Sequence, residues 1–258
     1  MSPPDVPADD RGLLLGDGLF ETVLAEAGEL RSFDAHLDRM TRGCSTIGIP
    51  PPDPAAARAA AEAALIEADL AGGRGAVRLT WTAGAGRGLE RAARARGRLI
   101  AQAFAAPRPE EPIHLATVGL RRNETSPLSR IKSLSYLDNV LARRQARQLG
   151  ADEALLLNGR GEIACAAAAN LFWVREGRLV TPALDCGVLD GIMRGRVIET
   201  AHALGIEVVE AAEPLTALQI AEGVFLSNSL IGLRQVVALD GRPLPASRLT
   251  AELSSRCR

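Results

Sequence analysis

Lysine is nearly absent from this chain of 258 residues, although basic side chains are plentiful. Lys132 is the only lysine, set against 29 arginines. An arginine guanidinium stays protonated throughout the working pH range, whereas a desolvated lysine amine can lose its proton and attack a carbonyl. Lys132 is therefore a candidate Schiff-base residue. Composition alone equally supports the alternative that an arginine-rich sequence simply retained one surface lysine.

Other scarcities exclude several classes of protein. The four cysteines form no CxxC pair and the three histidines form no HxxxH pair, so we expect neither a zinc site nor a disulfide framework. No apolar run approaches the roughly 20 residues that cross a bilayer, and the first residues lack the basic and apolar regions of a signal peptide. The net charge of −1 argues against nucleic-acid binding. We expect a cytoplasmic protein that binds neither nucleic acid nor a membrane.

Hydrophobic patterning predicts a mixture of strands and helices around a substantial core. The predicted strands cover 19–25, 75–82, 98–104, 113–120, 153–157, 162–165, 170–174, 178–181, 223–226 and 234–239, and the predicted helices start at 33 and cover 55–71, 137–149 and 191–204. Asp34 is the expected N-cap of the first helix, and residues 11–18 look like a glycine-rich loop. Because the elements lack a βαβ repeat, the predicted fold class is α+β.

A proline-rich polar segment, Pro107 to Pro112, is the predicted domain boundary. It separates a smaller N-terminal α+β domain, residues 1–106, from a larger C-terminal domain, residues 112–258. On this division Lys132 belongs to the C-terminal domain.

Five short segments occur in a fixed order between about Asp9 and Asp240. They are Gly16-Asp17-Gly18-Leu19-Phe20-Glu21-Thr22, His36-Leu37-Asp38-Arg39-Met40, Lys132-Ser133-Leu134-Ser135-Tyr136-Leu137, Asn170-Leu171-Phe172 and Gly191-Ile192-Met193-Arg194. In this order and spacing the sequence resembles the class IV aminotransferases, the fold-type IV enzymes that carry pyridoxal 5'-phosphate (PLP). That family includes branched-chain aminotransferases, D-amino acid transaminases and 4-amino-4-deoxychorismate lyases. The resemblance implies two domains with the cofactor in the interdomain cleft, and a homodimer.

The resemblance assigns roles to three side chains. Lys132 would bond the cofactor aldehyde and later move protons on the substrate. Arg39 would bind the cofactor phosphate, for which a forked and permanently charged donor is well suited. Tyr136 would lie near the ring oxygen of the cofactor. The alternatives are a solvent-facing arginine and a tyrosine that only fills the core.

A second set of phosphate ligands is implied at two turns. Ile192 and Met193 would offer backbone N–H groups at the start of a helix, where unpaired donors and the helix dipole favour an anion. Ser229 would add a hydroxyl. The alternatives are an ordinary turn before a helix and a loop serine bonded to its own backbone.

Cys165 departs from the family pattern. Relatives place a glutamate five residues before the equivalent of Asn170, where it pairs with the protonated pyridine nitrogen. Glu162 is no obvious replacement, because three residues along a strand put two side chains on opposite faces. Without a carboxylate PLP is a weaker electron sink. We therefore expect Cys165 to favour an elimination that forms an aromatic product over transamination.

Segments 82–89, 170–173 and 227–230 resemble the aminodeoxychorismate lyase branch of the family most. The resemblance implies elimination of pyruvate from 4-amino-4-deoxychorismate, a small anionic amine with two carboxylates, to give 4-aminobenzoate. Arg87 would bind one carboxylate; a solvated arginine in a surface turn is the equal alternative. Two rival functions stay open, an aminotransferase for D- or branched-chain amino acids and a non-catalytic relative, and the pathway, folate or a specialised metabolite, stays open as well.

Overall fold

The structure, a computed structural model, describes residues 6–92, 96–108 and 112–257. It divides into unit 1, Met1–Arg108 with Ile131–Ser135, and unit 2, Pro109–Arg130 with Tyr136–Arg258. The boundary expected at residues 107–112 falls partly on residues 109–111, which lie outside the described residues. Lys132, assigned from the sequence to the C-terminal domain, groups with unit 1, because residues 131–135 pair with a strand of that unit.

Unit 1 is built on an antiparallel sheet in the order β2-β1-β3-β4. The strands are β1 (Gly18–Glu26), β2 (Glu29–Leu30), β3 (Arg74–Thr82) and β4 (Arg98–Ala105). The pairing of β1 with β3 runs from Gly18 opposite Thr82 to Glu26 opposite Arg74. Its alternation sends Leu19 and Val23 into the unit's hydrophobic core.

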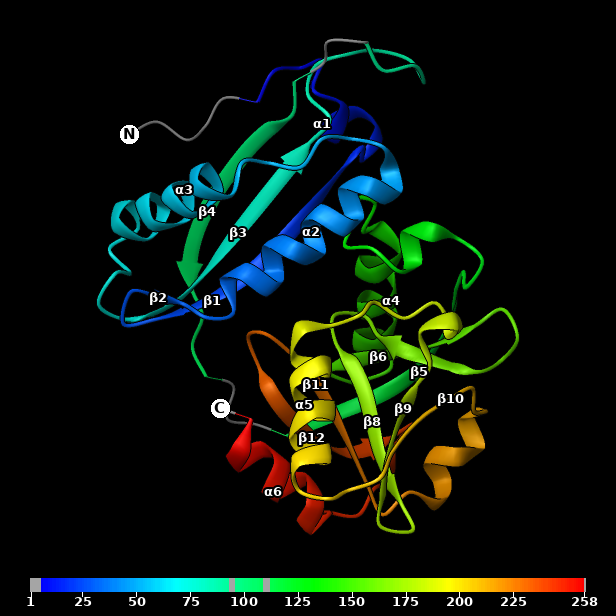
Figure 1. Ribbon diagram of the computed structural model, residues 1–258. Helices are drawn as coiled ribbons and strands as arrows, with labels where there is room; N and C mark the ends of the chain where they lie inside the picture. Colours follow the sequence, from blue (N-terminus) through cyan, green and yellow to red (C-terminus); the bar gives the residue numbers. More distant parts are fainter. Residues whose placement is uncertain (1–5, 93–95, 109–111, 258) are drawn as a thin grey trace. The chain divides into compact units, whose positions relative to one another are not determined.

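Three helices accompany this sheet: α1 (Arg11–Leu15), α2 (Phe33–Ile47) and α3 (Pro54–Glu67). Figure 1 shows α2 and α3 lying across the sheet, and their buried residues join the same core. The Asp53 carboxylate accepts from the N–H of Ala56 and caps α3. The predicted cap Asp34 is wrong for α2, because Ser32 holds the cap position in the left-handed conformation and Asp34 lies in the first turn.

Unit 2 contains a mixed nine-stranded sheet in the order β10-β9-β8-β11-β12-β5-β6-β7, with β13 paired to β12. The strands are β5 (Ile113–Arg122), β6 (Glu153–Asn158), β7 (Ile163–Ala166), β8 (Asn170–Arg175), β9 (Arg178–Pro182), β10 (Val208–Ala211), β11 (Gly223–Asn228), β12 (Gly232–Leu239) and β13 (Arg242–Pro243). The helices are η1 (Pro127–Ser129), α4 (Leu137–Gln148), η2 (Leu184–Cys186), α5 (Ile192–Ala203), η3 (Leu215–Ile220) and α6 (Arg248–Arg256). None of the helices formed by described residues is long and apolar enough to cross a bilayer.

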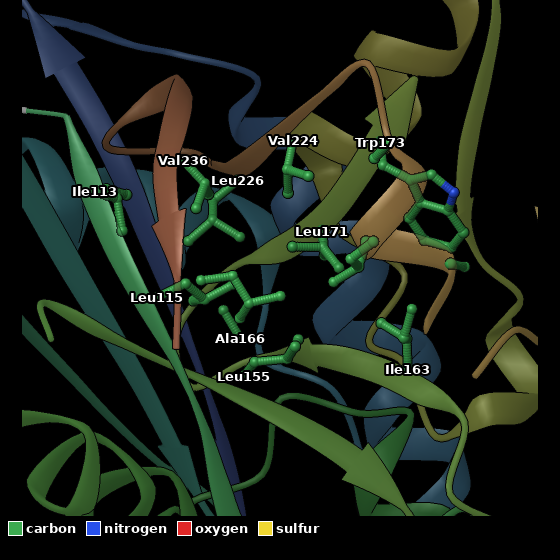
Figure 2. Close-up of a cluster of buried hydrophobic side chains, with 14 of the residues drawn as sticks. Ile113, Leu115, Leu155, Ile163, Ala166, Leu171, Trp173, Val224, Leu226 and Val236 are labelled. Atoms are coloured by element: carbon green, nitrogen blue, oxygen red, sulfur yellow. The ribbon is translucent and has the colours of Figure 1, made fainter. Parts of the chain in front are cut away.

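The two faces of the unit 2 sheet pack against different partners. One face forms the largest core, in which Leu115 of β5, Leu155 of β6, and Leu171 and Trp173 of β8 converge (Figure 2). On the other face, α4 packs against small side chains such as Ala116 and Ala154. The stacked rings of Phe172 and Phe225 pack against α5 and α6. Both faces are covered, and the strands β6, β7 and β11 are accordingly buried along almost their whole length.

The sequence missed several elements. The α1 helix falls in residues 11–18, which were interpreted as a loop, and β10 and α6 had no prediction. The helix α1 has only five residues, and its leucines at 13–15 are largely exposed, so no amphipathic period marks it.

Leu155 tests the unit 2 core separately, because Trp81 lies in unit 1 and Trp173 in unit 2. In a Trp81→Phe background, Trp173 fluorescence reports unfolding of unit 2 alone. Leu155→Ala removes a fully buried side chain and should lower the free energy of unfolding by about 2–5 kcal/mol in urea. Leu149→Ala, at a 65% exposed position, should change it by less than about 0.5 kcal/mol. Equal effects of the two substitutions would contradict this core.

Candidate active site

Lys132 is held by strand pairing with the start of β1. The N–H of Phe20 donates to the Lys132 carbonyl at 2.9 Å, and the N–H of Leu134 donates to the Gly18 carbonyl at 3.0 Å. Ser133 forms an antiparallel bridge with Leu19. Lys132 therefore ends a turn directly before the bridge residue, and the backbone from its carbonyl to Leu134 is fixed against β1.

The Lys132 side chain is half-buried and lies over an aromatic ring. Its Nζ is 4.3 Å from the centroid of the Phe20 ring, and the guanidinium carbon of Arg78 is 3.7 Å from the same centroid. Two cationic groups thus share one buried ring, an arrangement in which cation–π attraction offsets part of their repulsion. Phe20 belongs to the motif Gly16 to Thr22, whereas nothing in the sequence distinguishes Arg78 from the other arginines.

Arg39 lies in a buried cluster with Glu21 and His36. Arg39 Nε donates to Glu21 Oε1 at 2.8 Å and Nη2 donates to Oε2 at 2.6 Å. His36 Nδ1 is 2.7 Å from the same Oε2. Burial raises the pKa of Glu21, but the charge of Arg39 and the hydrogen bonds outweigh it and lower that pKa to about 2. Arg39 is therefore buried, and the solvent-facing alternative is wrong.

In unit 2 the helix start proposed to bind phosphate is locked by a neighbouring asparagine. Gly191 is the N-cap of α5 and offers no side chain to the first N–H groups, those of Ile192 and Met193. Asn170 Nδ2 donates to the Leu189 carbonyl at 2.9 Å. A Cβ at Gly191 would stand 2.0 Å from Asn170 Oδ1, so only glycine fits this close approach.

The loop that carries Ser229 starts beside the same asparagine. Ser227 pairs with Asn170 in the ladder between β11 and β8. The next residue, Asn228, accepts through Oδ1 from the N–H groups of Leu230 and Ile231, both at 2.9 Å. This closed turn fixes the backbone on each side of Ser229. The structure therefore joins the α5 start and the Ser229 loop through Asn170.

Arg194 anchors the first turn of α5. It is 3% exposed, and its Nη2 donates to the Pro182 carbonyl and to Glu210. It also forms an ion pair with Asp190. These contacts tie the helix start to the ends of β9 and β10. The sequence gives Arg194 only as the last residue of a short motif and indicates no role for its side chain.

Tyr136 lies at the N-cap of α4. Its hydroxyl donates to the Ala167 carbonyl at 3.4 Å, and Asn139 Nδ2 donates to the same carbonyl at 2.6 Å. Burial raises the pKa of Tyr136, so the phenol keeps its proton.

Cys165 lies in β7 opposite Leu156 of β6. Burial raises the pKa of this thiol, which therefore stays neutral. Glu162 is already engaged, because it accepts from Asn158 at 2.7 Å and from Arg160 at 2.9 Å. It lies just outside β7, so these partners, rather than alternation along a strand, explain why it does not replace a carboxylate at 165.

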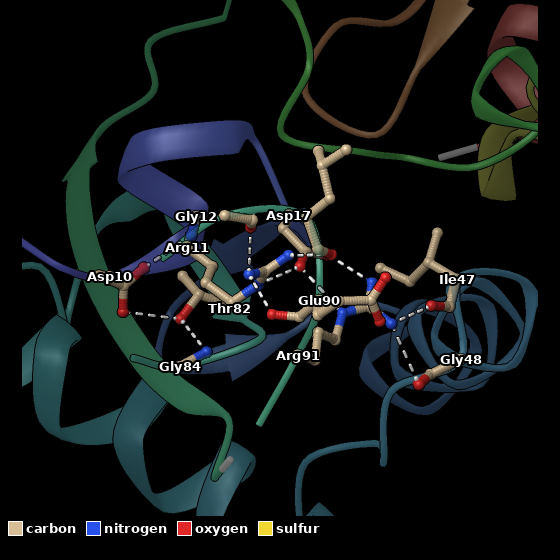
Figure 3. Close-up of polar contacts among 12 residues, drawn as sticks. Asp10, Arg11, Gly12, Asp17, Ile47, Gly48, Thr82, Gly84, Glu90 and Arg91 are labelled. Atoms are coloured by element: carbon tan, nitrogen blue, oxygen red, sulfur yellow. Dashed lines mark hydrogen bonds and ion pairs between the residues drawn. The ribbon is translucent and has the colours of Figure 1, made fainter. Parts of the chain in front are cut away.

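Arg87 is exposed in a turn whose next residues are bonded by the side chain of Arg11. Figure 3 shows Arg11 among its partners, with Asp17 and Glu90 labelled. Arg11 donates to the carbonyls of Gly88, Leu89 and Glu90, and its Nε donates to Asp17 at 2.7 Å. The buried Arg11 therefore fixes the backbone next to Arg87. The side chain of Arg87 itself remains accessible.

Gly191 and Gly195 give opposite predictions for one substitution on one helix. Gly191→Ala should lower the free energy of unfolding by about 1–3 kcal/mol through the clash with Asn170. Gly195→Ala meets nothing within 4 Å inside α5, so alanine should raise it by up to about 1 kcal/mol. Urea unfolding followed by Trp173 fluorescence in the Trp81→Phe background measures both. Stabilisation by both alanines would refute the close approach at Gly191.

The sequence of this chain is similar to those of known proteins along nearly its whole length. A model of the amino-transferase class IV family matches residues 18–239. A Methanocaldococcus jannaschii protein, provisionally named a branched-chain-amino-acid aminotransferase, is 36% identical over 242 residues, which are 90% of this chain and 82% of the relative.

Two solved structures resemble the whole chain. The 4-amino-4-deoxychorismate lyase of Pseudomonas aeruginosa is 33% identical with a TM-score of 0.89, over 99% of this chain and 95% of that chain. A hypothetical aminotransferase of Mycobacterium tuberculosis, solved in a PLP-bound form, is 25% identical with a TM-score of 0.86, over 99% and 94%. The predicted α+β fold of the fold-type IV enzymes is confirmed. The chain belongs to the class IV aminotransferase family.

Proposed function

We propose that this protein is a PLP-dependent lyase that eliminates pyruvate from 4-amino-4-deoxychorismate and releases 4-aminobenzoate. The main support for elimination over transamination is Cys165, a buried and neutral thiol at the position where the family pattern has a glutamate. Similarity to a lyase of known structure supports it, and similarity to an aminotransferase supports the rival function.

The described residues fit a cofactor with an aldehyde and a phosphate. Lys132 is the only primary amine among the side chains, and its backbone is fixed by β1. The α5 start, rigidly held and without a side-chain cap, suits a phosphate, as does the buried Arg39. Ser227 Oγ is fully buried next to this turn and has no hydrogen-bond partner among the residues that the structure describes. Tyr136, with its proton retained, suits the ring oxygen.

Bound PLP supplies an electrophilic carbonyl and an electron-withdrawing ring. Lys132 would hold the aldehyde carbon of this cofactor, and its amine, once the substrate amine has taken its place, would accept the proton from the amine-bearing carbon of the substrate. The ether bond to the enolpyruvyl group breaks, and the leaving oxygen receives a proton that Lys132 can return. Because aromatisation drives this elimination, a pyridine ring without a carboxylate partner suffices.

The substrate carries two carboxylates, and two arginines of unit 1 suit them. Arg78 shares the Phe20 ring with Lys132, and Arg87 projects from the turn that Arg11 fixes. Arginine is the side chain best suited to planar, bidentate binding of a carboxylate. The family resemblance further supports a homodimer and a cytoplasmic location.

Pyruvate release tests the proposal directly. The purified protein, loaded with PLP, should release pyruvate from 4-amino-4-deoxychorismate, measured with lactate dehydrogenase and NADH. Lys132→Ala should lower kcat by at least about 10²-fold, because it removes both the bonding amine and the proton carrier. A PLP-loaded protein that releases no pyruvate, yet converts its cofactor to pyridoxamine phosphate with an amino donor, would establish the aminotransferase instead.

Cys165→Glu tests why elimination is favoured. A carboxylate at this position would stabilise the protonated pyridine ring, so conversion of the cofactor to pyridoxamine phosphate by D-alanine or a branched-chain amino acid should increase at least tenfold. Cys165→Ser, which adds no charge, is the matched control and should leave that conversion slow. Absorbance of the bound cofactor follows both variants. Equal rates in the two variants would refute the proposed role of Cys165.

The same spectra distinguish the non-catalytic alternative. A protein that binds the cofactor at Lys132 absorbs in the visible range and bleaches with borohydride. A protein that stays colourless with excess PLP would instead keep the fold for partner binding.

A further inference from the structure

Three ionisable side chains are buried together between β1 and α2. Glu21 is 1% exposed, His36 2% and Arg39 8%. Glu21 comes from the strand, whereas His36 and Arg39 are three residues apart on one face of the helix. Both helical side chains contact the carboxylate of Glu21. The same oxygen, Oε2, is hydrogen-bonded to His36 Nδ1 and to Arg39 Nη2.

The contacts determine which edge of the Arg39 guanidinium points away from Glu21. A guanidinium presents five N–H donors in a rigid plane. Glu21 takes the edge formed by Nε and Nη2, with both oxygens used. The plane cannot turn without breaking two charge-assisted hydrogen bonds. The edge that carries Nη1 is therefore held in one direction.

His36 in turn holds the carboxylate. Its Nδ1 lies 2.7 Å from Oε2, so rotation of the Glu21 carboxylate would cost this contact together with those to Arg39. Glu21 itself stands in the middle of β1, whose pairing with β3 is continuous from Gly18 to Glu26. The orientation of Arg39 thus depends on a rigid strand through two successive contacts.

Stability alone gives little reason for such a cluster. Replacing a buried ion pair by apolar side chains of similar volume is often neutral or stabilising. The surroundings would accept apolar groups, because the neighbouring residues of β1 and α2, among them Leu19, Val23 and Met40, form the core of unit 1. A charged cluster inside that core is better explained by a requirement for one fixed arginine pose.

We propose that Glu21, held by His36, is a positioning residue that fixes the Arg39 guanidinium for the phosphate of the cofactor. The inference rests on the proposed role of Arg39. Neither Glu21 nor His36 needs to touch the cofactor. Loss of Glu21 should therefore weaken binding of a phosphorylated ligand and leave the binding of its unphosphorylated counterpart nearly unchanged.

The experiment compares PLP with pyridoxal, which has the aldehyde and lacks the phosphate. The apo-protein is titrated with each, and the ratio of the two dissociation constants isolates the contribution of the phosphate. Glu21→Gln keeps the shape of the side chain and removes its charge. It should reduce the preference for PLP roughly tenfold or more, the size of effect expected when an orienting partner is removed. His36→Leu should also reduce the preference for PLP over pyridoxal. His36→Asn, whose amide can donate a hydrogen bond as Nδ1 does, should keep that preference near the wild-type value.

Two controls separate positioning from general destabilisation. Glu26→Gln makes the same change on the same strand in the ion pair with Arg74, and should leave the preference unchanged. In an Arg39→Met background Glu21→Gln should have no further effect, because the group that it positions is gone. If Glu21→Gln does not fold, the His36 variants make the same comparison.

The outcomes also separate this inference from the proposed function. If the wild-type protein binds PLP at Lys132 but Glu21→Gln weakens PLP and pyridoxal equally, or weakens neither, the positioning role is wrong and the enzyme assignment stands. If borohydride attaches no PLP to Lys132 of the wild-type protein, the proposed function fails, and the positioning role fails with it.

Discussion

The pairing of residues 132–134 with the start of β1 is the interaction on which the candidate site depends. Two backbone hydrogen bonds and the bridge at Leu19 fix a segment far away in the sequence. These bonds use backbone groups and not the Lys132 side chain, whose Nζ lies over the ring of Phe20. The next residue of the strand, Glu21, holds Arg39. Consecutive residues of one strand thus anchor two of the proposed site residues.

Unit 2 fixes the residues that the family resemblance assigns to phosphate binding by a different kind of contact. Its phosphate-binding candidates are backbone groups, so their placement depends on fixing turns rather than side chains. Asn170 and Asn228 do this with amide hydrogen bonds, and Arg194 ties down the helix start. Amide groups bond the backbone without adding a net charge, which would compete with an anionic ligand. The family resemblance assigned Ile192, Met193 and Ser229 to phosphate binding, which stays a prediction, and the structure shows which contacts fix their turns.

The sequence predicted what short-range patterns encode, and it missed what tertiary pairing decides. Alternation predicted most strands correctly, whereas the rarity of lysine made Lys132 a candidate whose role stays a prediction. The partner of Arg39 was not predictable, because Glu21 lies 18 residues away and becomes a neighbour only when α2 packs on β1. Arg78 gave no signal for the same reason. Asp34 failed as a cap because the conformation of Ser32 shifted the helix start, and the irregular register between β6 and β7 limits arguments from alternation near Cys165.

Under the proposed function, the buried and neutral Cys165 would favour one reaction over another within a shared fold. A glutamate at this position would have to be desolvated, and only a positive charge on the bound ring would offset that cost. A neutral thiol avoids the desolvation cost of a carboxylate, but it does not stabilise a positive charge on the pyridine ring. Since one pKa unit corresponds to about 1.4 kcal/mol, even a modest loss slows a reaction that stores an electron pair in the ring. A reaction that expels a leaving group and forms an aromatic ring depends less on that storage, so under the proposed function a cysteine at this position would penalise transamination more than elimination.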